Sequence, residues 1–509
     1  MLQQNSYRIP RYWRWLKKDY GSDWRLVDVA LIFLLMSSNL IDKRIAAIVV
    51  AITCLVKIYL IFRKKHKKSL VFTKRVWRIY SVTAILALGS ALAVILTTAP
   101  REFALGFYYG PLVCIAFMLL EAIFSWAIVI VAVIILMPVE KMINNRYRKE
   151  AVDILRSVPG LRIIGITGSY GKTSTKHYLQ RILSEKYETL MTPGSYNTPM
   201  GVIRTVREQL KPFTEVFICE MGAKQKGDIK EICDLVHPHF GIITAVGPMH
   251  LETFGNIETV QSTKFELVDS LPNDGLAVIN DDFEYCAERE VTNVSCLRYA
   301  VTNIAGADYR AENIVYSPEG TTFDVVGSEG LIMKLRTRLV GECNISNLLG
   351  AVVMAKKLGV ENEKIVYAVS NIQQVEHRLS IRKTPGGVTI IDDAFNSNPT
   401  GSKMALDVLA GFKEYGKRII ITPGMIELGK EQTKLNKEFG RHIGKSVDIA
   451  IVVGEYNREA IVAGIKDTEF PEEDIIIADS FNHAQQLLGN ILSKGDVVLY
   501  ENDLPDSFK

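Results

Sequence analysis

The segment with the clearest chemical signature is GSYGKTS at residues 168–174. Glycines such as Gly168 and Gly171 let backbone N–H groups converge on a phosphate. Lys172 would supply a point charge to the terminal phosphates, and the hydroxyl of Thr173 would reach a magnesium ion, with Ser174 beside it. The spacing therefore predicts a site for a nucleoside triphosphate and its Mg²⁺.

A second chemical group follows an apolar run. Residues 215–219 read as a buried strand, and Glu220 stands at its end. In a parallel α/β sheet, the carboxyl ends of the strands are where ligands and metals bind. We therefore expect Glu220 to hold Mg²⁺ together with Thr173, although a single acid at a strand end is often only solvated.

Several longer strings resemble the Mur ligase superfamily. GITGSYGKTS at 165–174 resembles the nucleotide loop of Mur ligases and folylpolyglutamate synthetases. EMGAKQKGDI at 220–229 and TAVGPMHLETFG at 244–255 resemble segments of the Mur ligase that adds D-alanyl-D-alanine to the UDP-linked muramoyl tripeptide. About ten such motifs follow in family order between residues 160 and 500.

The resemblance assigns roles that the residues alone do not. It implies that His250 is a metal ligand, and that Lys264 is the lysine that Mur ligases commonly carry as a carbamate. It also implies that Asn280, in a strand-like run, and Asn347, in GECNISN, contact the nucleotide, with Asn347 at the adenine. In GECNISN a cysteine, Cys343, stands where the family usually has histidine.

Further implied contacts come from the last part of the chain. By resemblance, Arg378 reaches the nucleotide phosphates from a domain junction. In DDAFNSNP at 392–399, Asp393 would touch the ribose, while Asn396 and Asn398 would line the substrate cleft. PGMIELG at 423–429 matches another family motif. The terminal stretch 499–506 is acidic where the family carries K-G-S-R.

Strands alternating with amphipathic helices must position these groups. The predicted fold is an α-helical membrane domain followed by α/β domains. We expect the membrane domain at residues 1–150, a P-loop Mur ligase central domain at 151–375, and a Rossmann-like C-terminal domain at 376–509. The membrane segment stands where the family carries its UDP-binding domain.

Four apolar runs predict transmembrane helices, with the first two forming a tight hairpin. Lys and Arg flank them unequally, 18 against 3, which places the N-terminus and the catalytic domains in the cytoplasm of a multi-pass plasma-membrane protein. Asp28 and Glu121 lie within the runs, and Glu121 is the better functional candidate. The runs cover residues 26–41, 45–62, 79–97 and 112–137.

Composition limits the other functional classes. The net charge is only +4, and no basic groove with interleaved aromatics is apparent, so we expect no nucleic-acid partner. Seven scattered cysteines without a CxxC pair argue against a disulfide framework or a zinc site, and favour a reducing compartment.

The expected activity is an ATP- and Mg²⁺-dependent amide-bond ligase that forms an acyl phosphate. It would add an amino acid or dipeptide to a cell-wall peptide, with a lipid-linked precursor as one form of the acceptor and membrane lipids as partners. Two alternatives stay open: a polyglutamate-type synthetase, and a membrane transporter or signaling NTPase with a ligase-like nucleotide domain. The sequence leaves the oligomeric state undetermined.

Overall fold

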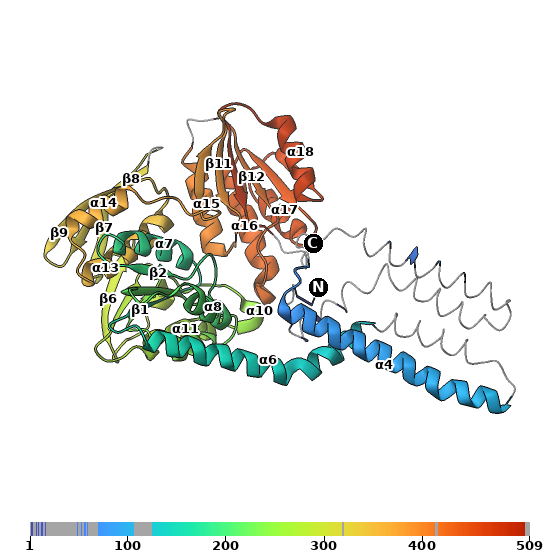
Figure 1. The fold of residues 1–509 in the computed structure, drawn as a ribbon. Coiled ribbons are helices and arrows are strands. Elements are labelled where there is room, and N and C mark those ends of the chain that lie inside the picture. The colour runs from blue at the N-terminus through green and yellow to red at the C-terminus, as the bar shows by residue number, and fades with distance from the viewer. Residues whose placement is uncertain are drawn as a thin grey trace. The chain divides into compact units, whose positions relative to one another are not determined.

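The computed structural model describes residues 70–105, 125–317, 320–395, 397–412 and 416–503, with a few isolated positions before residue 70 (Figure 1). The chain divides into two compact units, Met1–Asn145 and Arg146–Lys509. The second unit contains both sheets and all of the expected ligase motifs.

Two long apolar helices belong to the first part of the chain. They are α4 (Lys74–Leu105) and α6 (Ser125–Arg156), and the second of these continues across the unit boundary. Lys74–Val94 and Ser125–Arg156 are long and apolar enough to cross a membrane, judged by length and composition. An ion pair of 2.7 Å joins Arg78 on α4 to Glu140 on α6.

The described residues cover one of the four predicted spans fully and a second in part. The run 79–97 lies in α4, and the run 112–137 is described only from residue 125, in α6. The runs 26–41 and 45–62 lie outside the described residues apart from isolated positions, as do Asp28 and Glu121. A four-span membrane domain is therefore not established by the described residues.

A nine-stranded sheet forms the first lobe of the second unit, in the order β2-β3-β1-β4-β5-β6-β7-β8-β9. Its strands are parallel from β2 to β7, and the last two pairings are antiparallel. The strands are β1 (Arg162–Thr167), β2 (Thr189–Met191), β3 (Val216–Glu220), β4 (Phe240–Ile243), β5 (Leu276–Asn280), β6 (Ser295–Ala300), β7 (Tyr309–Ser317), β8 (Gly320–Gly327) and β9 (Gly330–Thr337).

Helices cover both faces of this sheet, which explains why β1 and β3 read as continuous apolar runs rather than alternating ones. On β1, Ile164 and Ile166 join one core cluster and Ile163 joins the other. The helices of the lobe are α7 (Lys172–Leu183), α8 (Pro199–Gln209), α9 (Asp228–Val236), α10 (Leu251–Phe254), α11 (Ile257–Phe265), η1 (Val268–Ser270), α12 (Glu284–Ala287), α13 (Glu342–Lys357) and α14 (Asn362–Ser370).

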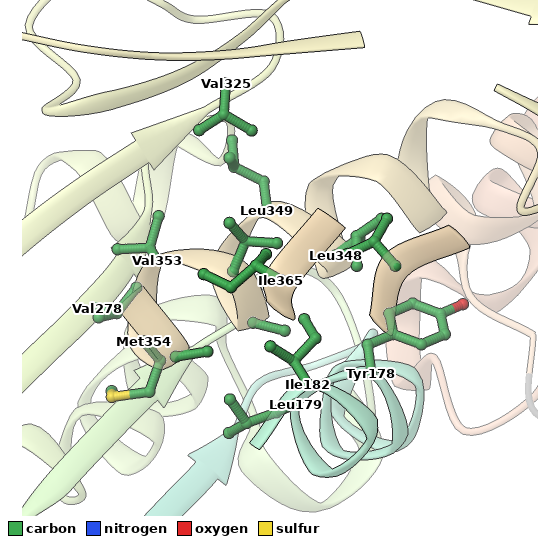
Figure 2. Close-up of a cluster of buried hydrophobic side chains, with 14 of the residues drawn as sticks. Tyr178, Leu179, Ile182, Val278, Val325, Leu348, Leu349, Val353, Met354 and Ile365 are labelled. Carbon is green, nitrogen blue, oxygen red and sulfur yellow. The ribbon is translucent and has the colours of Figure 1, made fainter. Parts of the chain in front are cut away.

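The first core cluster fixes α7, the helix that follows the glycine-rich loop. Figure 2 shows Leu179 and Ile182 of α7 near Leu348 of α13 and Ile365 of α14. All four side chains are fully buried. Since each full burial of a Leu or Ile contributes about 1.5–3 kcal/mol, these contacts hold α7 against α13 and α14.

The second lobe is a six-stranded sheet in the order β10-β11-β15-β12-β13-β14, parallel except for β10. Core clusters lie on both of its faces. Its strands are β10 (Ser380–Lys383), β11 (Thr389–Asp393), β12 (Arg418–Thr422), β13 (Ile449–Val453), β14 (Ile475–Ala478) and β15 (Val497–Glu501). Its helices are α15 (Pro399–Ala410), η2 (Gly429–Glu431), α16 (Gln432–Ser446), α17 (Arg458–Lys466), η3 (Glu472–Asp474) and α18 (Phe481–Ile491).

Candidate active site

The glycine-rich loop connects the end of β1 to the N-terminus of α7. Gly171 caps α7 with a left-handed φ of 82°. A Cβ atom at Gly171 would lie 2.1 Å from Oδ1 of Asn347, so the close approach of the loop to α13 requires glycine. Free N–H groups at a helix N-terminus suit an anion, and the loop geometry therefore fits a nucleotide phosphate.

Lys172 lies over this loop. Its Nζ donates to the carbonyl oxygens of Gly168 at 2.6 Å and Ser169 at 3.2 Å. Burial lowers the pKa of Lys172 to about 8, while the charge of Glu220 works in the opposite direction. The ammonium group is therefore still mostly protonated at neutral pH, as a phosphate contact requires.

Glu220, at the end of β3, is only 1% exposed. Its Oε2 accepts hydrogen bonds from Oγ1 of Thr173 at 3.1 Å and Nζ of Lys176 at 2.9 Å. Its Oε1 accepts from Nδ2 of Asn197 at 3.1 Å. Burial works to raise the pKa of Glu220, but Lys176 and then Lys172 hold it below its usual value. Glu220 is thus an ionised carboxylate beside the Thr173 hydroxyl.

Sequence reasoning missed Lys176, which is 0% exposed and also donates to the carbonyl oxygen of Gly194 at 2.5 Å. Lysine is almost never fully buried unless it is paired. The signal was available in the spacing, because residues four apart on a helix share a face and Lys176 follows Lys172 by four. Lys176 therefore links Glu220 to the loop that contains Asn197.

The residues present fit a magnesium ion bound with a nucleotide. Within the described part of the chain, no three His, Cys, Asp or Glu side chains cluster so as to hold a metal. Mg²⁺ in nucleotide sites takes one or two protein oxygens and completes its shell with phosphates and water. Thr173 and Glu220 supply a hydroxyl and a carboxylate 3.1 Å apart, which suits that kind of site.

A cavity of about 280 Å³ lies between the two lobes and brings together residues far apart in the sequence. Tyr170 of the phosphate loop donates from its hydroxyl to Thr400 of the second lobe at 3.1 Å, next to this cavity. Seven of the predicted site residues line it: Gly171, Ser174, Asn280, Asn347, Arg378, Asp393 and Asn398.

Two of these asparagines also have structural roles. Nδ2 of Asn280 donates to the carbonyl oxygen of Thr244 at 2.9 Å and to Ser346 at 2.8 Å. Oδ1 of Asn398 accepts from the N–H of Gly401 at 2.8 Å and caps α15. Their side chains thus stabilise the cavity wall, and a direct substrate contact stays a prediction. Asn396 lies outside the described residues.

Arg378 and Asp393 both line the cavity from the second lobe. The Arg378 guanidinium lies 4.2 Å from the ring centre of Phe395. Burial raises the pKa of Asp393 to about 6, although Arg378 and the N–H of Leu379 lower it. Burial also lowers the pKa of Arg378. Both groups are partly buried, where a charged ligand would interact with them more strongly than in open water.

The remaining predicted residues, His250 and Lys264, do not line this cavity. His250 contacts Glu427 through Nδ1. Lys264 is 3% exposed, and burial, followed by the nearby Lys172 charge, lowers its pKa well below the usual value. The charge of Lys172 thus disfavours a second positive charge at Lys264. The metal and catalytic roles of these two residues stay predictions.

Comparison with protein families identifies both lobes. Residues 166–355 match the Mur ligase middle domain, and residues 377–500 match the family described as Mur ligase, glutamate ligase domain. Together these two matches cover more than half of the chain, and they confirm the predicted α/β central and C-terminal ligase domains.

Similar proteins and solved structures also indicate a Mur ligase. The chain is 28% identical to UDP-N-acetylmuramoyl-tripeptide–D-alanyl-D-alanine ligase of Bacillus subtilis (strain 168), over 67% of this chain and 73% of the relative. Identity to the enzyme of the same name from Escherichia coli (strain K12) is 28%, over 68% and 76%. MurF from Acinetobacter baumannii superimposes with a TM-score of 0.64 at 25% identity, covering 70% and 77%. MurF ligase from Thermotoga maritima, solved in complex with ADP, gives 0.63 at 25% identity, covering 71% and 80%.

Proposed function

Because the chain belongs to the Mur ligase family and is an ATP-dependent acid–amino-acid ligase, we propose that it adds an amino acid or dipeptide to the peptide of a peptidoglycan precursor. The observation that carries this proposal is the meeting of Lys172, Thr173 and Glu220 at the N-terminus of α7, next to the interlobe cavity. We assign the ligase lobes to residues 151–375 and 376–509, and residues 1–150 to a membrane domain.

The side chains support a division of labour. Bound ATP with Mg²⁺ would supply the phosphoryl group that activates a substrate carboxylate. Lys172 and the loop N–H groups hold the terminal phosphates, and Thr173 with Glu220 orients the metal. Asn347 and Asp393 bind the base and the ribose. Phosphoryl transfer depends mainly on such positioning and charge stabilisation, so these groups account for most of the expected rate.

Lys264 is the residue we propose to be carbamylated. Carbamate formation joins the unprotonated ε-amine to carbon dioxide with loss of one proton, so it needs a lysine that gives up its proton easily. Burial and the charge of Lys172 both favour the neutral amine at Lys264. The resulting anion would lie in an environment that already contains the positive Lys172 and would offer a ligand to the metal, alongside His250.

The amine is D-alanyl-D-alanine or a close analogue, by likeness to relatives named for that dipeptide. The form of the acceptor is the less constrained part of the proposal. Glu501 and Asp503 stand in the stretch where the family is basic, which favours an acceptor held differently from the soluble UDP-linked peptide. We propose a lipid-linked acceptor presented at the membrane.

The apolar helices support membrane anchoring. Ile85 and Leu88 on α4 are 68% and 72% exposed, and Ile134 on α6 is 51% exposed. Large apolar patches on soluble proteins usually mark contact surfaces, and on helices of this length they suit lipid. Basic residues at the start of α4 and in the latter half of α6 fit the cytoplasmic side, which supports a cytoplasmic position of the ligase lobes.

The ligation test uses the full-length protein with ATP, Mg²⁺ and panels of UDP-linked and lipid-linked muramoyl peptides and amines. Mass spectrometry should find one pair that gains an amide with ADP release, and Lys172→Met should abolish the product while the exposed Lys211→Met keeps it. Formation of a glutamate chain would favour a polyglutamate-type synthetase. ATP hydrolysis without any amide product would contradict the proposal.

Anchoring is tested separately by membrane fractionation. The full-length chain should stay with the membrane after alkaline carbonate washing, which strips peripheral proteins. Recovery in the soluble fraction would exclude spanning helices and leave the ligase assignment intact.

A further inference from the structure

A loop of the second lobe reaches the His250 motif of the first. This loop, residues 423–429, connects β12 to η2 and carries Glu427. The carboxylate of Glu427 contacts Nδ1 of His250 through Oε2 and Nζ of Lys224 through Oε1, the latter at 3.3 Å. A backbone hydrogen bond from the N–H of Glu252 to the carbonyl oxygen of Glu427, 3.3 Å long, joins the same segments.

The backbone on both sides of this contact is strained. His250 and Glu427 have left-handed φ angles of 52° and 62°, which residues with a side chain rarely adopt. Gly429, with φ 60°, lies so close to Glu252 that a Cβ atom would be 3.2 Å from its nitrogen. Strained conformations persist only where surrounding contacts enforce them, and they gather at functional sites. These backbone conformations cost stability, and they accompany the contact between the side chains of His250 and Glu427.

The contact determines how His250 can act. A carboxylate at Nδ1 favours the tautomer with the proton on Nδ1, which leaves a lone pair on Nε2. Among the described residues, Nε2 of His250 makes no hydrogen bond. Lys224 balances the second oxygen of Glu427, so the carboxylate stays ionised and keeps its orientation.

We propose that Glu427 is a positioning residue: from the second lobe it orients His250 of the first lobe so that Nε2 can ligate the divalent metal. This inference rests on the proposed function, since it takes His250 as a ligand. Because the carboxylate and the imidazole belong to different lobes, metal binding and lobe closure stabilise each other. Such coupling is reciprocal, so metal should order the 423–429 loop as much as the loop strengthens metal binding.

The test measures Mn²⁺ binding to the full-length protein with ADP present, by electron paramagnetic resonance. Loss of an orienting partner typically weakens metal affinity 10–100-fold, so Glu427→Ala should weaken Mn²⁺ binding by about that factor. Glu427→Gln, which keeps a hydrogen-bond acceptor without the charge, should lie between Glu427→Ala and the wild type. The matched control is Glu431→Gln, because the side chain of Glu431 is 47% exposed and its ion pair within the described residues is with Lys434.

Hydrogen exchange gives a readout independent of turnover. Mn²⁺ with ADP should slow exchange in residues 423–429 of the wild type and not of Glu427→Ala. In ligation assays, excess Mg²⁺ should restore the rate of Glu427→Gln, which a purely structural defect would not allow.

Wild-type Mn²⁺ affinity in both Glu427 variants would overturn the positioning role, and if Glu427→Ala does not fold, Glu427→Gln decides alone. Amide formation by the wild type is scored separately. A failure of the ligase proposal is therefore distinguishable from a failure of this one.

Discussion

Two buried glutamates hold equivalent places in the two sheets, yet their surroundings are opposite. Glu220 ends β3 and Glu501 ends β15. Glu220 accepts hydrogen bonds at both oxygens, two of them from Lys176 and Thr173. Glu501 accepts one, from Ser397 at 2.6 Å, and its Oε2 has no partner among the described residues.

The neighbour in the sheet completes the contrast. Glu501 lies in register with Asp393, so two carboxyl groups share one buried edge. Burial, and then Asp393, raises the pKa of Glu501 well above its usual value, which favours the neutral acid over the carboxylate. The end of a parallel strand thus places a carboxyl group at the edge of the sheet where ligands bind. Whether that group is charged depends on the neighbours that the fold brings to it.

The largest expected effect concerns Glu220, the charged member of the two glutamates. Lys176→Met would leave Glu220 buried without its closest cation, and breaking a buried pair typically costs about 3–5 kcal/mol. Chemical denaturation should show that loss of stability. The double variant Lys176→Met/Glu220→Gln should recover part of it, since no buried charge is left over. A loss of stability below about 1 kcal/mol would mean that Lys176 does not offset the cost of burying the charge of Glu220.

The next effect concerns catalysis. Glu220→Gln keeps the shape of the side chain but removes the charge that we assign to the metal. Loss of one such electrostatic group typically lowers kcat by about 10²–10³-fold. Nucleotide-dependent Mn²⁺ binding should weaken in parallel. The exposed Glu208→Gln is the matched control, and a Glu220→Gln enzyme with wild-type kcat would remove Glu220 from the mechanism.

A smaller effect on stability, of opposite sign, is expected at the carboxyl pair of Glu501 and Asp393. The pKa of Asp393 is about 6 when folded against an ordinary 3.8, so the folded protein keeps this proton to higher pH than the unfolded chain. The contribution to stability is fully present below about pH 4 and is lost as pH rises through about 6. The raised pKa of Glu501 acts in the same direction.

Glu501→Gln should therefore stabilise the protein at neutral pH, by about 1 kcal/mol, and make stability depend less on pH above about 4, the ordinary pKa range of a glutamate. Thermal unfolding at a series of pH values measures both effects. A destabilised variant with an unchanged pH profile would show that Glu501 is ionised in the folded protein. The comparison with Glu220 would then fail.

The smallest effect sets the scale for partly exposed charges. Arg181 on α7 and Glu185 in the turn that follows this helix form an i, i+4 ion pair of 2.5 Å with side chains 31% and 21% exposed. A double-mutant cycle with alanine at both positions should give a coupling of about 0.3–0.5 kcal/mol. A coupling as large as that of Lys176 with Glu220 would mean that burial does not explain the difference in strength between the two ion pairs.

Much of the fold and part of the site could be predicted from the sequence. The order of strand, glycine loop and helix placed Lys172 and Thr173 at the start of α7, and the apolar run before Glu220 placed that carboxylate at a strand end. These predictions depend on neighbours along the chain. The contacts of Lys176 with Glu220 and of Glu427 with His250 were not predicted, because in each the two residues are more than 40 positions apart.

The sequence by itself determined a nucleotide-binding α/β fold, because periodicity and glycine spacing are local and act over a few residues. Its resemblance to the Mur ligases added the expectation of a ligase. The sequence also determined that apolar runs precede the ligase lobes. Only the tertiary structure decided which buried acid is charged, which lysine compensates it, and which carboxylate meets His250. Those outcomes depend on distances across two lobes and on removal from water, and neither quantity is encoded in any single stretch of the chain.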